Sequence, residues 1–171
     1  ITNTMKSHGE KVSEMLTSTY LRYLCGAFII TPVQRYDIHG RRIFEQNNKF
    51  YFADHGLRNL LCGFNLRGSI EKVMENAIHH HLVTQGFKVT VGILRNGEVD
   101  FVAVRDERRL YVQAVYLLGS EETVAREFGN LQAIRDNYPK YVVSMDPVSG
   151  GLPEYPGIIH VHLREFLMTD F

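Results

Sequence analysis

The sequence predicts an α/β protein, and three features of the 171-residue chain support that fold class. Apolar residues recur at helical spacing in two segments of the C-terminal two thirds, which predicts two amphipathic helices. Three apolar runs of strand length lie between these helices, and the first two are joined by Asn96-Gly97, a strong hairpin signal. The composition, 44% hydrophobic and 22% charged, is that of a soluble globular protein.

The first predicted unit, residues 1–65, consists of a helix followed by a two-stranded ribbon. Residues 9–26 carry apolar side chains at helical spacing, and Gly26 is a suitable C-terminal stop. An extended run at 28–33, a polar turn and a return strand at 48–52 follow. This is the skeleton of a winged-helix module, although any small helix-plus-hairpin unit would give the same pattern.

The second predicted unit, residues 66–171, has the order helix, three-strand meander, helix, strand, strand. Its first helix is expected to begin at a Ser69 cap and to end at Gly86. The later elements are strands at 87–94, 98–104 and 110–118, a helix at 121–136 capped by Ser120, and strands at 140–146 and 158–163. This order predicts a mixed sheet flanked by helices.

A polar pair inside the meander is the main functional signal. If the second hairpin is centred between Asp106 and Glu107, Asp100 lies directly across from Gln113 and shares a face with it. Both strands are apolar on both faces, so we expect central strands that are covered on two sides. A lone carboxylate is costly there unless it is hydrogen-bonded or bound to a metal.

Two interpretations of this pair stay open. Glu75, on the preceding helix, could converge with Asp100 and Gln113 on a divalent ion such as Mg²⁺, which prefers oxygen ligands. Alternatively, Gln113 donates its amide hydrogens to Asp100, and Glu75 is an ordinary solvated carboxylate.

The missing cation weakens the first interpretation. A working phosphodiesterase would need a lysine two residues beyond Gln113, and Val115 stands at that position. Lys72 on the helix and Lys88 on the first strand could substitute, but no pattern places either side chain at the site.

Basic and histidine side chains supply weaker candidates. Contact with DNA phosphates is one interpretation of the charged ribbon, and solvent exposure without any partner is the other; the residues concerned are Arg35, Arg41, Arg42 and Lys49. His79, His80 and His81 are adjacent on a helix and point about 100° apart, so we expect a solvated flank instead of a metal site. His160 and His162 share a strand face, but no third ligand is evident.

Several motifs together resemble a known protein region. They are Lys49-Phe50-Tyr51 with Asp54 and Gly56-Leu57, then Glu75-Asn76, Asp100 and Tyr111-Val112-Gln113. The sequence is similar to the C-terminal region of a large group of prokaryotic AAA+ ATPases, a domain of unknown function that follows the ATPase core. The resemblance implies a winged helix at 1–65 and a restriction-endonuclease-like, Holliday-junction-resolvase-like fold at 66–171.

Carried onto this chain, the resemblance implies nuclease positions at Glu75, Asp100 and Gln113, with Val115 where the lysine would stand. We therefore expect a non-catalytic accessory region of an AAA+ ATPase that binds DNA or a protein partner. The alternatives are an active Mg²⁺-dependent DNA nuclease with a relocated lysine and an assembly domain that forms homo-oligomers. No cofactor is expected in this fragment, because ATP and Mg²⁺ would bind the absent upstream ATPase module, and Mg²⁺ would bind here only if the nuclease site is active.

Charge and cysteine content bear on location. The 19 basic and 19 acidic residues balance, although residues 1–65 carry 8 basic and 5 acidic groups and the rest of the chain carries 11 and 14. Cys25 and Cys62 suit buried free thiols in a reducing compartment. With neither a signal peptide nor an apolar run of about 18 residues, we expect a cytoplasmic protein without a membrane partner. Because the chain opens at Ile1 without methionine, we also expect a fragment.

Overall fold

The computed structural model describes residues 1–63, 66–147 and 152–171, with the side chains of residues 45–46 and 66–67 left aside. Within these ranges the helices are α1 (Thr2–Ser7), α2 (Glu14–Gly26), α3 (His55–Cys62), α4 (Leu66–Thr84), α5 (Glu121–Gln132) and α6 (Leu163–Leu167). The strands are β1 (Ile30–Asp37), β2 (Arg42–Phe52), β3 (Lys88–Leu94), β4 (Gly97–Arg105), β5 (Arg108–Ala114), β6 (Lys140–Ser144) and β7 (Ile158–His162). The predicted α/β class is confirmed.

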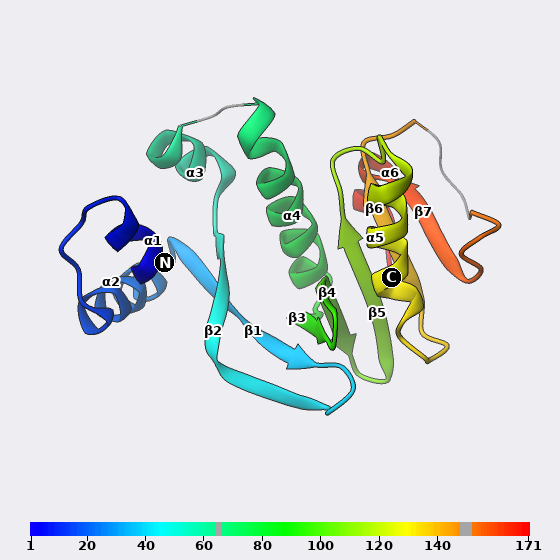
Figure 1. Cartoon of the computed structure of the whole chain (residues 1–171), viewed down its shortest axis with the longest axis horizontal. Helices are drawn as coiled ribbons and strands as arrows, with labels where there is room; N and C mark the ends of the chain where they lie inside the picture. Colours follow the sequence, from blue (N-terminus) through cyan, green and yellow to red (C-terminus); the bar gives the residue numbers. More distant parts are fainter. Residues whose placement is uncertain (64–65, 148–151) are drawn as a thin grey trace.

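The described strands form one mixed sheet in the order β2-β1-β3-β4-β5-β6-β7 (Figure 1). Pairs β1–β2, β3–β4 and β4–β5 are antiparallel, whereas β1–β3, β5–β6 and β6–β7 are parallel. The ribbon of the first predicted unit therefore continues the sheet of the second, through the parallel pairing of Arg35–Asp37 with Val91–Ile93. The winged-helix and restriction-endonuclease-like assignments, and the boundary at residue 65, stay predictions.

Helices cover both faces of the central strands. On one face, Ile78 and Leu82 of α4 pack with Phe101 and Val112 in one buried cluster. On the other face, Phe128 and Leu131 of α5 pack with Val102 and Tyr111 in a second cluster. Successive residues of β5 alternate between these two clusters, as the pleat of a strand requires. The expectation that β4 and β5 are covered on two sides is confirmed.

Several predicted helix ends need correction. The hydroxyl of Ser120 accepts the N–H of Thr123 at 3.1 Å, so this cap is confirmed, and Gly86 follows α4 with a φ of +83°. Ser69 is not the cap of α4, because the helix already begins at Leu66 and includes Ser69 in its first turns. Residues 9–13 lie outside α2, whose N-cap is Ser13. No helix of the described residues is long and apolar enough to cross a membrane.

Candidate functional site

Three charged side chains from distant parts of the chain meet on the α4 face of the sheet; we call them the acid–lysine cluster. They are Lys49 of β2, Glu75 of α4 and Asp100 of β4. The Lys49 ammonium lies 2.5 Å from Glu75 Oε2 and 3.2 Å from Asp100 Oδ1. Glu75 also accepts the hydroxyl of Tyr51 at 3.3 Å, and Asp100 Oδ2 accepts the N–H of Ala114 at 3.0 Å. With two carboxylates and one ammonium, the cluster carries a formal charge of −1 when fully ionised.

Lys49 reaches this position because β2 is irregular and pinned. Val33 pairs with Lys49 but Arg35 pairs with Phe44, so residues 45–48 lie opposite the single residue Gln34. Such a bulge bends a strand and re-aims its side chains.

Beyond the bulge, the edge strand β2 is fastened to α4. The amide side chain of Asn76 accepts the N–H of Phe52 and donates to its carbonyl, both at 2.9 Å. Asn76 follows Glu75 directly in α4. These two hydrogen bonds therefore fix the position of β2, which carries Lys49, relative to Glu75.

Asp100 reaches the same face through a second bulge. Thr90 pairs with Val102 and Gly92 pairs with Val99, so Asp100 and Phe101 lie together opposite Val91. The extra residue breaks the alternation of β4, because Val99 and Val102 both pack on the α5 side while Phe101 packs on the α4 side. The Asp100 carboxylate therefore joins Phe101 on the α4 face.

This bulge overturns one expectation about Gln113. The predicted register is correct, since Phe101 pairs with Val112, and Gln113 Oε1 accepts the N–H of Asp100 at 3.3 Å. The shared face is wrong, because the amide of Gln113 points to α5 and donates to Glu127 at 2.8 Å. The Asp100 carboxylate lies on the opposite face, within the cluster. Gln113 therefore supports the strand that carries Asp100, and its side chain does not join the cluster.

The displaced ammonium is also a finding that the sequence patterns missed. Val115 is buried in the α5-side core, and the nitrogen beside the two carboxylates belongs to Lys49, for which the sequence left DNA contact and solvent exposure as the two interpretations. Of the two suggested substitutes, Lys72 lines the pocket beside Glu75, and Lys88 lies exposed on β3.

Burial and charge shift the protonation equilibria of the cluster. Burial, together with Glu75, raises the pKa of Asp100 to about 6, against the opposing effects of Lys49 and the Ala114 N–H. Burial alone would lower the pKa of Lys49, but the carboxylates of Asp100 and Glu75 outweigh it and raise that pKa. Burial and then Glu75 raise the pKa of Tyr51. Near neutral pH, the lysine is therefore charged and Asp100 ionises only a little below that range.

An open pocket of about 530 Å³ lies beside the cluster, between β2, α3 and α4. Its walls include Lys49 and Glu75, the additional cations Arg58 and Lys72, and the thiol of Cys62. Cys62 is exposed, so the expectation of a buried thiol is wrong for this residue, whereas Cys25 is half-buried. The pocket gives an anionic ligand access to Lys49 and Glu75, whereas Asp100 lies behind them and does not line it.

The arrangement of carboxylate, histidine and cysteine side chains limits which metal the described part of the chain could hold. No three side chains of histidine, cysteine, aspartate or glutamate come together there as a metal site. Glu75 and Asp100 offer two carboxylates that share one lysine, and Mg²⁺ is commonly held by one or two carboxylates with water and phosphate oxygens completing its shell. The donor set therefore fits a Mg²⁺ or Mn²⁺ ion that also binds its substrate.

The other basic ribbon residues divide into two groups. Arg35 pairs with Glu98 and donates to the carbonyl of Asn47 at 2.8 Å, so it ties the ribbon to β4. Arg41 and Arg42 are exposed at the ribbon turn, where Arg42 lies 3.5 Å from Asp37. Contact of these arginines with DNA stays a prediction.

The histidine triplet is not the solvated flank that we expected. His79 is 3% exposed and stacks on the Tyr51 ring with centroids 4.5 Å apart. Burial, with a smaller effect of His80, lowers the pKa of His79 to about 4, so this ring is neutral at physiological pH. On β7, His160 is buried against the hydroxyl of Ser144 at 2.7 Å. These contacts give His79 and His160 packing roles.

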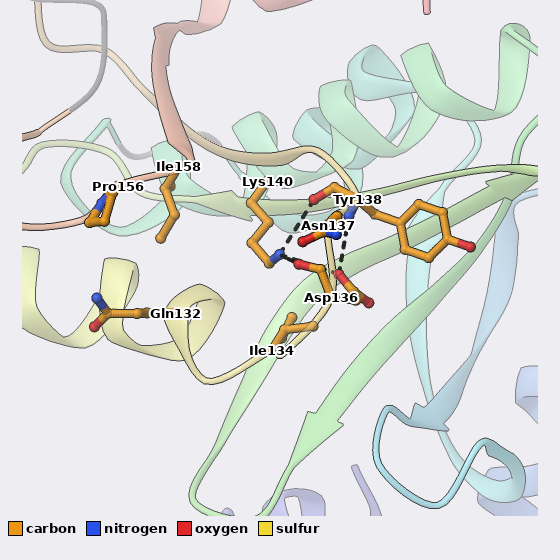
Figure 2. A pocket seen from close by; sticks show the side chains of 9 residues that line it. Gln132, Ile134, Asp136, Asn137, Tyr138, Lys140, Pro156 and Ile158 are labelled. Atoms are coloured by element: carbon orange, nitrogen blue, oxygen red, sulfur yellow. Dashed lines mark hydrogen bonds and ion pairs between the residues drawn. The ribbon is translucent and has the colours of Figure 1, made fainter.

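A second lysine cluster lies near the start of β6, and Figure 2 shows its side chains. Lys140 donates to the Asp136 carbonyl at 2.6 Å, to Asp136 Oδ1 at 3.2 Å and to the Tyr138 carbonyl at 3.4 Å. Asp136 Oδ2 accepts the hydroxyl of Tyr111 at 2.6 Å. One cation faces one carboxylate here, and each ammonium hydrogen has an acceptor nearby.

Comparisons with known proteins give a family match over part of the chain, a sequence relative and a weak structural match. Residues 3–67 match a family described as a domain of unknown function (DUF8612). The chain is 33% identical over 144 residues to an uncharacterized protein of Haemophilus influenzae, a match that covers 84% of this chain and 35% of that protein. A crystal structure of protein VC1899 from Vibrio cholerae matches with 13% identity and a TM-score of 0.34, over 98% of this chain and 46% of that one.

The chain thus spans less than half the length of each of these two proteins. The names of these three matches refer neither to an ATPase nor to a nuclease. The similarity to AAA+ ATPases stays a prediction.

Proposed function

We propose that the acid–lysine cluster hydrolyses a phosphodiester bond with the help of a divalent metal ion. This is the nuclease alternative with a relocated lysine. The observation that carries it is the Lys49 ammonium, which lies within hydrogen-bond distance of both Glu75 and Asp100. A carboxylate pair and a lysine beside an open pocket provide the groups that this reaction needs.

The charge of the cluster supports metal binding. Lys49 balances only one of the two carboxylates, and the raised pKa of Asp100 reflects the cost of holding the second negative charge in a buried place. A divalent cation on Glu75 and Asp100 would remove that cost. Such an ion, once bound, would polarise a water molecule for attack and would neutralise charge on the phosphate.

The residues of the chain then have distinct roles. Glu75 and Asp100 would hold the ion, while the Tyr51 hydroxyl orients Glu75 and the N–H of Ala114 orients Asp100. With both carboxylates engaged by the ion, the Lys49 ammonium would donate to a phosphate oxygen on which negative charge grows in the transition state. Gln113 and Glu127 lie on the opposite, α5-side face of the sheet, where they hold β4 in position at Asp100.

The second candidate is the non-catalytic accessory role, within an ATPase or an assembly, that the sequence favoured. Two observations support it: Lys49 already neutralises part of the acidic charge, and the Gln113 amide is engaged by Glu127. Under this proposal, the cluster ties β2 to the centre of the sheet, and the pocket binds nucleic acid or protein without cleaving it.

Hydrolysis by the purified chain separates the two candidates. We would measure cleavage of bis(p-nitrophenyl) phosphate and of a labelled single-stranded oligonucleotide, with Mg²⁺, Mn²⁺ or EDTA. The nuclease proposal expects metal-dependent cleavage that Asp100→Asn abolishes and that Lys88→Ala, an exposed lysine on β3, leaves unchanged. Equal rates for wild type and Asp100→Asn, or no metal-dependent cleavage of either substrate, would leave the accessory role as the better account.

A further inference from the structure

Arg58 is a buried cation in the pocket wall. Its side chain comes from α3, and the residue is only 7% exposed. The guanidinium donates to the amide oxygen of Asn59 at 2.9 Å, and it makes no ion pair with any side chain in the described part of the chain. A buried charge is costly when no opposite charge accompanies it, so this arginine is placed as if for an anion from outside the fold.

A second cation lies on the same pocket. Lys72 is exposed on α4 and precedes Glu75 by three residues, so the two side chains lie on neighbouring positions of one helix surface. Arg58, Lys72 and Glu75 all line the pocket of about 530 Å³. The pocket therefore has two cations that lie outside the acid–lysine cluster.

We propose that Arg58 and Lys72 hold the phosphate next to the one at the acid–lysine cluster. The substrate is then a polynucleotide strand, since a simple phosphodiester lacks the second phosphate. This inference rests on the proposed function for its placement of the scissile phosphate. The planar fork of arginine suits two phosphate oxygens, and lysine adds a point charge. The pocket volume falls in the range of about 300–1,000 Å³ that is usual for ligand sites.

We call Arg58 and Lys72 the phosphate clamp, and binding without cleavage tests this clamp directly. We would titrate the whole chain with a fluorescent single-stranded oligonucleotide in EDTA, at several salt concentrations, and compare Lys72→Ala and Arg58→Lys with the matched control Lys88→Ala. Loss of the Lys72 contact should weaken binding several-fold and lower the salt dependence by about 0.7 in the log–log slope. Arg58→Lys should weaken binding as well, because it keeps the charge but loses the fork. Equal affinities for Lys72→Ala and Lys88→Ala would overturn the inference.

Cys62 provides a readout in the unmodified protein. Its exposed thiol lines the same pocket, whereas Cys25 lies in α2, outside that pocket. Saturating oligonucleotide should slow alkylation of Cys62 by iodoacetamide several-fold and leave Cys25 unchanged. Unchanged alkylation of Cys62, or equally strong protection by polyglutamate at the same charge concentration, would overturn the clamp.

Two substrates separate this inference from the proposed function. Lys72→Ala should slow oligonucleotide cleavage several-fold at low substrate concentration, and it should leave cleavage of bis(p-nitrophenyl) phosphate within about twofold of wild type, because that ester carries a single phosphate. An equal loss of cleavage rate on both substrates would contradict the phosphate clamp and would leave the nuclease proposal standing. If neither substrate is cleaved, the nuclease proposal fails while the binding and alkylation experiments still decide the clamp.

Discussion

The two lysine clusters of this protein use the same ionic groups to opposite effect. Lys140 has a side chain that is 9% exposed, and one carboxylate and two backbone carbonyls surround its ammonium (Figure 2). Lys49 has a side chain that is 27% exposed and faces two carboxylates beside an open pocket. Around Lys140 the charges are matched, whereas around Lys49 one negative charge is left over.

This difference separates an ion pair that supports the fold from one that is suited to bind a ligand. The Asp136 carboxylate accepts from Lys140, from the Tyr111 hydroxyl and from the N–H of Tyr138, so it holds the loop before β6 in place. Asp100 has a raised pKa, and it shares the Lys49 ammonium with Glu75. Substitutions in the two clusters should therefore differ in sign for stability and in their effect on activity.

The largest expected effect is on the proposed reaction. Lys49→Ala should lower the rate of metal-dependent phosphodiester cleavage by about 10²–10³-fold, a barrier increase of about 3–4 kcal/mol, because the phosphate loses a preorganised donor. Initial rates at saturating Mg²⁺ would measure the change, with Lys88→Ala as the control. A rate within about threefold of wild type would show that this ammonium serves only to hold the ribbon on the sheet.

The next effect concerns the matched cluster. Asp136→Asn should lower the free energy of unfolding by about 3 kcal/mol, because it leaves the buried Lys140 ammonium without its counter-charge. Urea denaturation followed by circular dichroism would measure the loss. A change below about 0.5 kcal/mol would mean that the backbone carbonyls suffice for Lys140 and that this cluster is not an essential support.

The same substitution in the acid–lysine cluster should act in the other direction. The folded protein holds the Asp100 proton more tightly than the unfolded chain does, with a pKa of about 6 against an ordinary value of 3.8. The resulting stability is fully present below the unfolded pKa and is lost as pH rises through the folded pKa. Asp100→Asn avoids that loss, so at about pH 8 it should raise the free energy of unfolding by about 1 kcal/mol.

Below about pH 3 this gain should disappear, because wild-type Asp100 is then protonated and neutral in both states. Urea denaturation at the two pH values measures both results. A loss of stability at about pH 8 that equals the loss in Asp136→Asn would show that the two clusters are alike.

Much of the fold could be predicted from local patterns. The order of elements after residue 66 is correct, and the hairpin centre between Asp106 and Glu107 is borne out by the pairing of Arg105 with Arg108. These features depend on periodicity and turn chemistry, which act over a few residues.

The assembly of the site could not be predicted in this way. Lys49 meets Asp100 across three neighbouring strand pairs, β2–β1, β1–β3 and β3–β4. The β1–β3 pair is parallel, and no short sequence pattern predicts that pairing. Two bulges then decide which faces are used. An unbroken β4 would have placed Asp100 on the same face as Val102, toward α5.

Mn²⁺ binding measured by isothermal titration calorimetry tests the central claim most directly. The account predicts that wild-type protein binds the ion at about pH 7.5, that Asp100→Asn weakens binding by about tenfold or more, and that Asp136→Asn binds as wild type does once its folded fraction is considered. Absence of Mn²⁺ binding to the wild-type protein, or equal binding by wild type and Asp100→Asn, would contradict it.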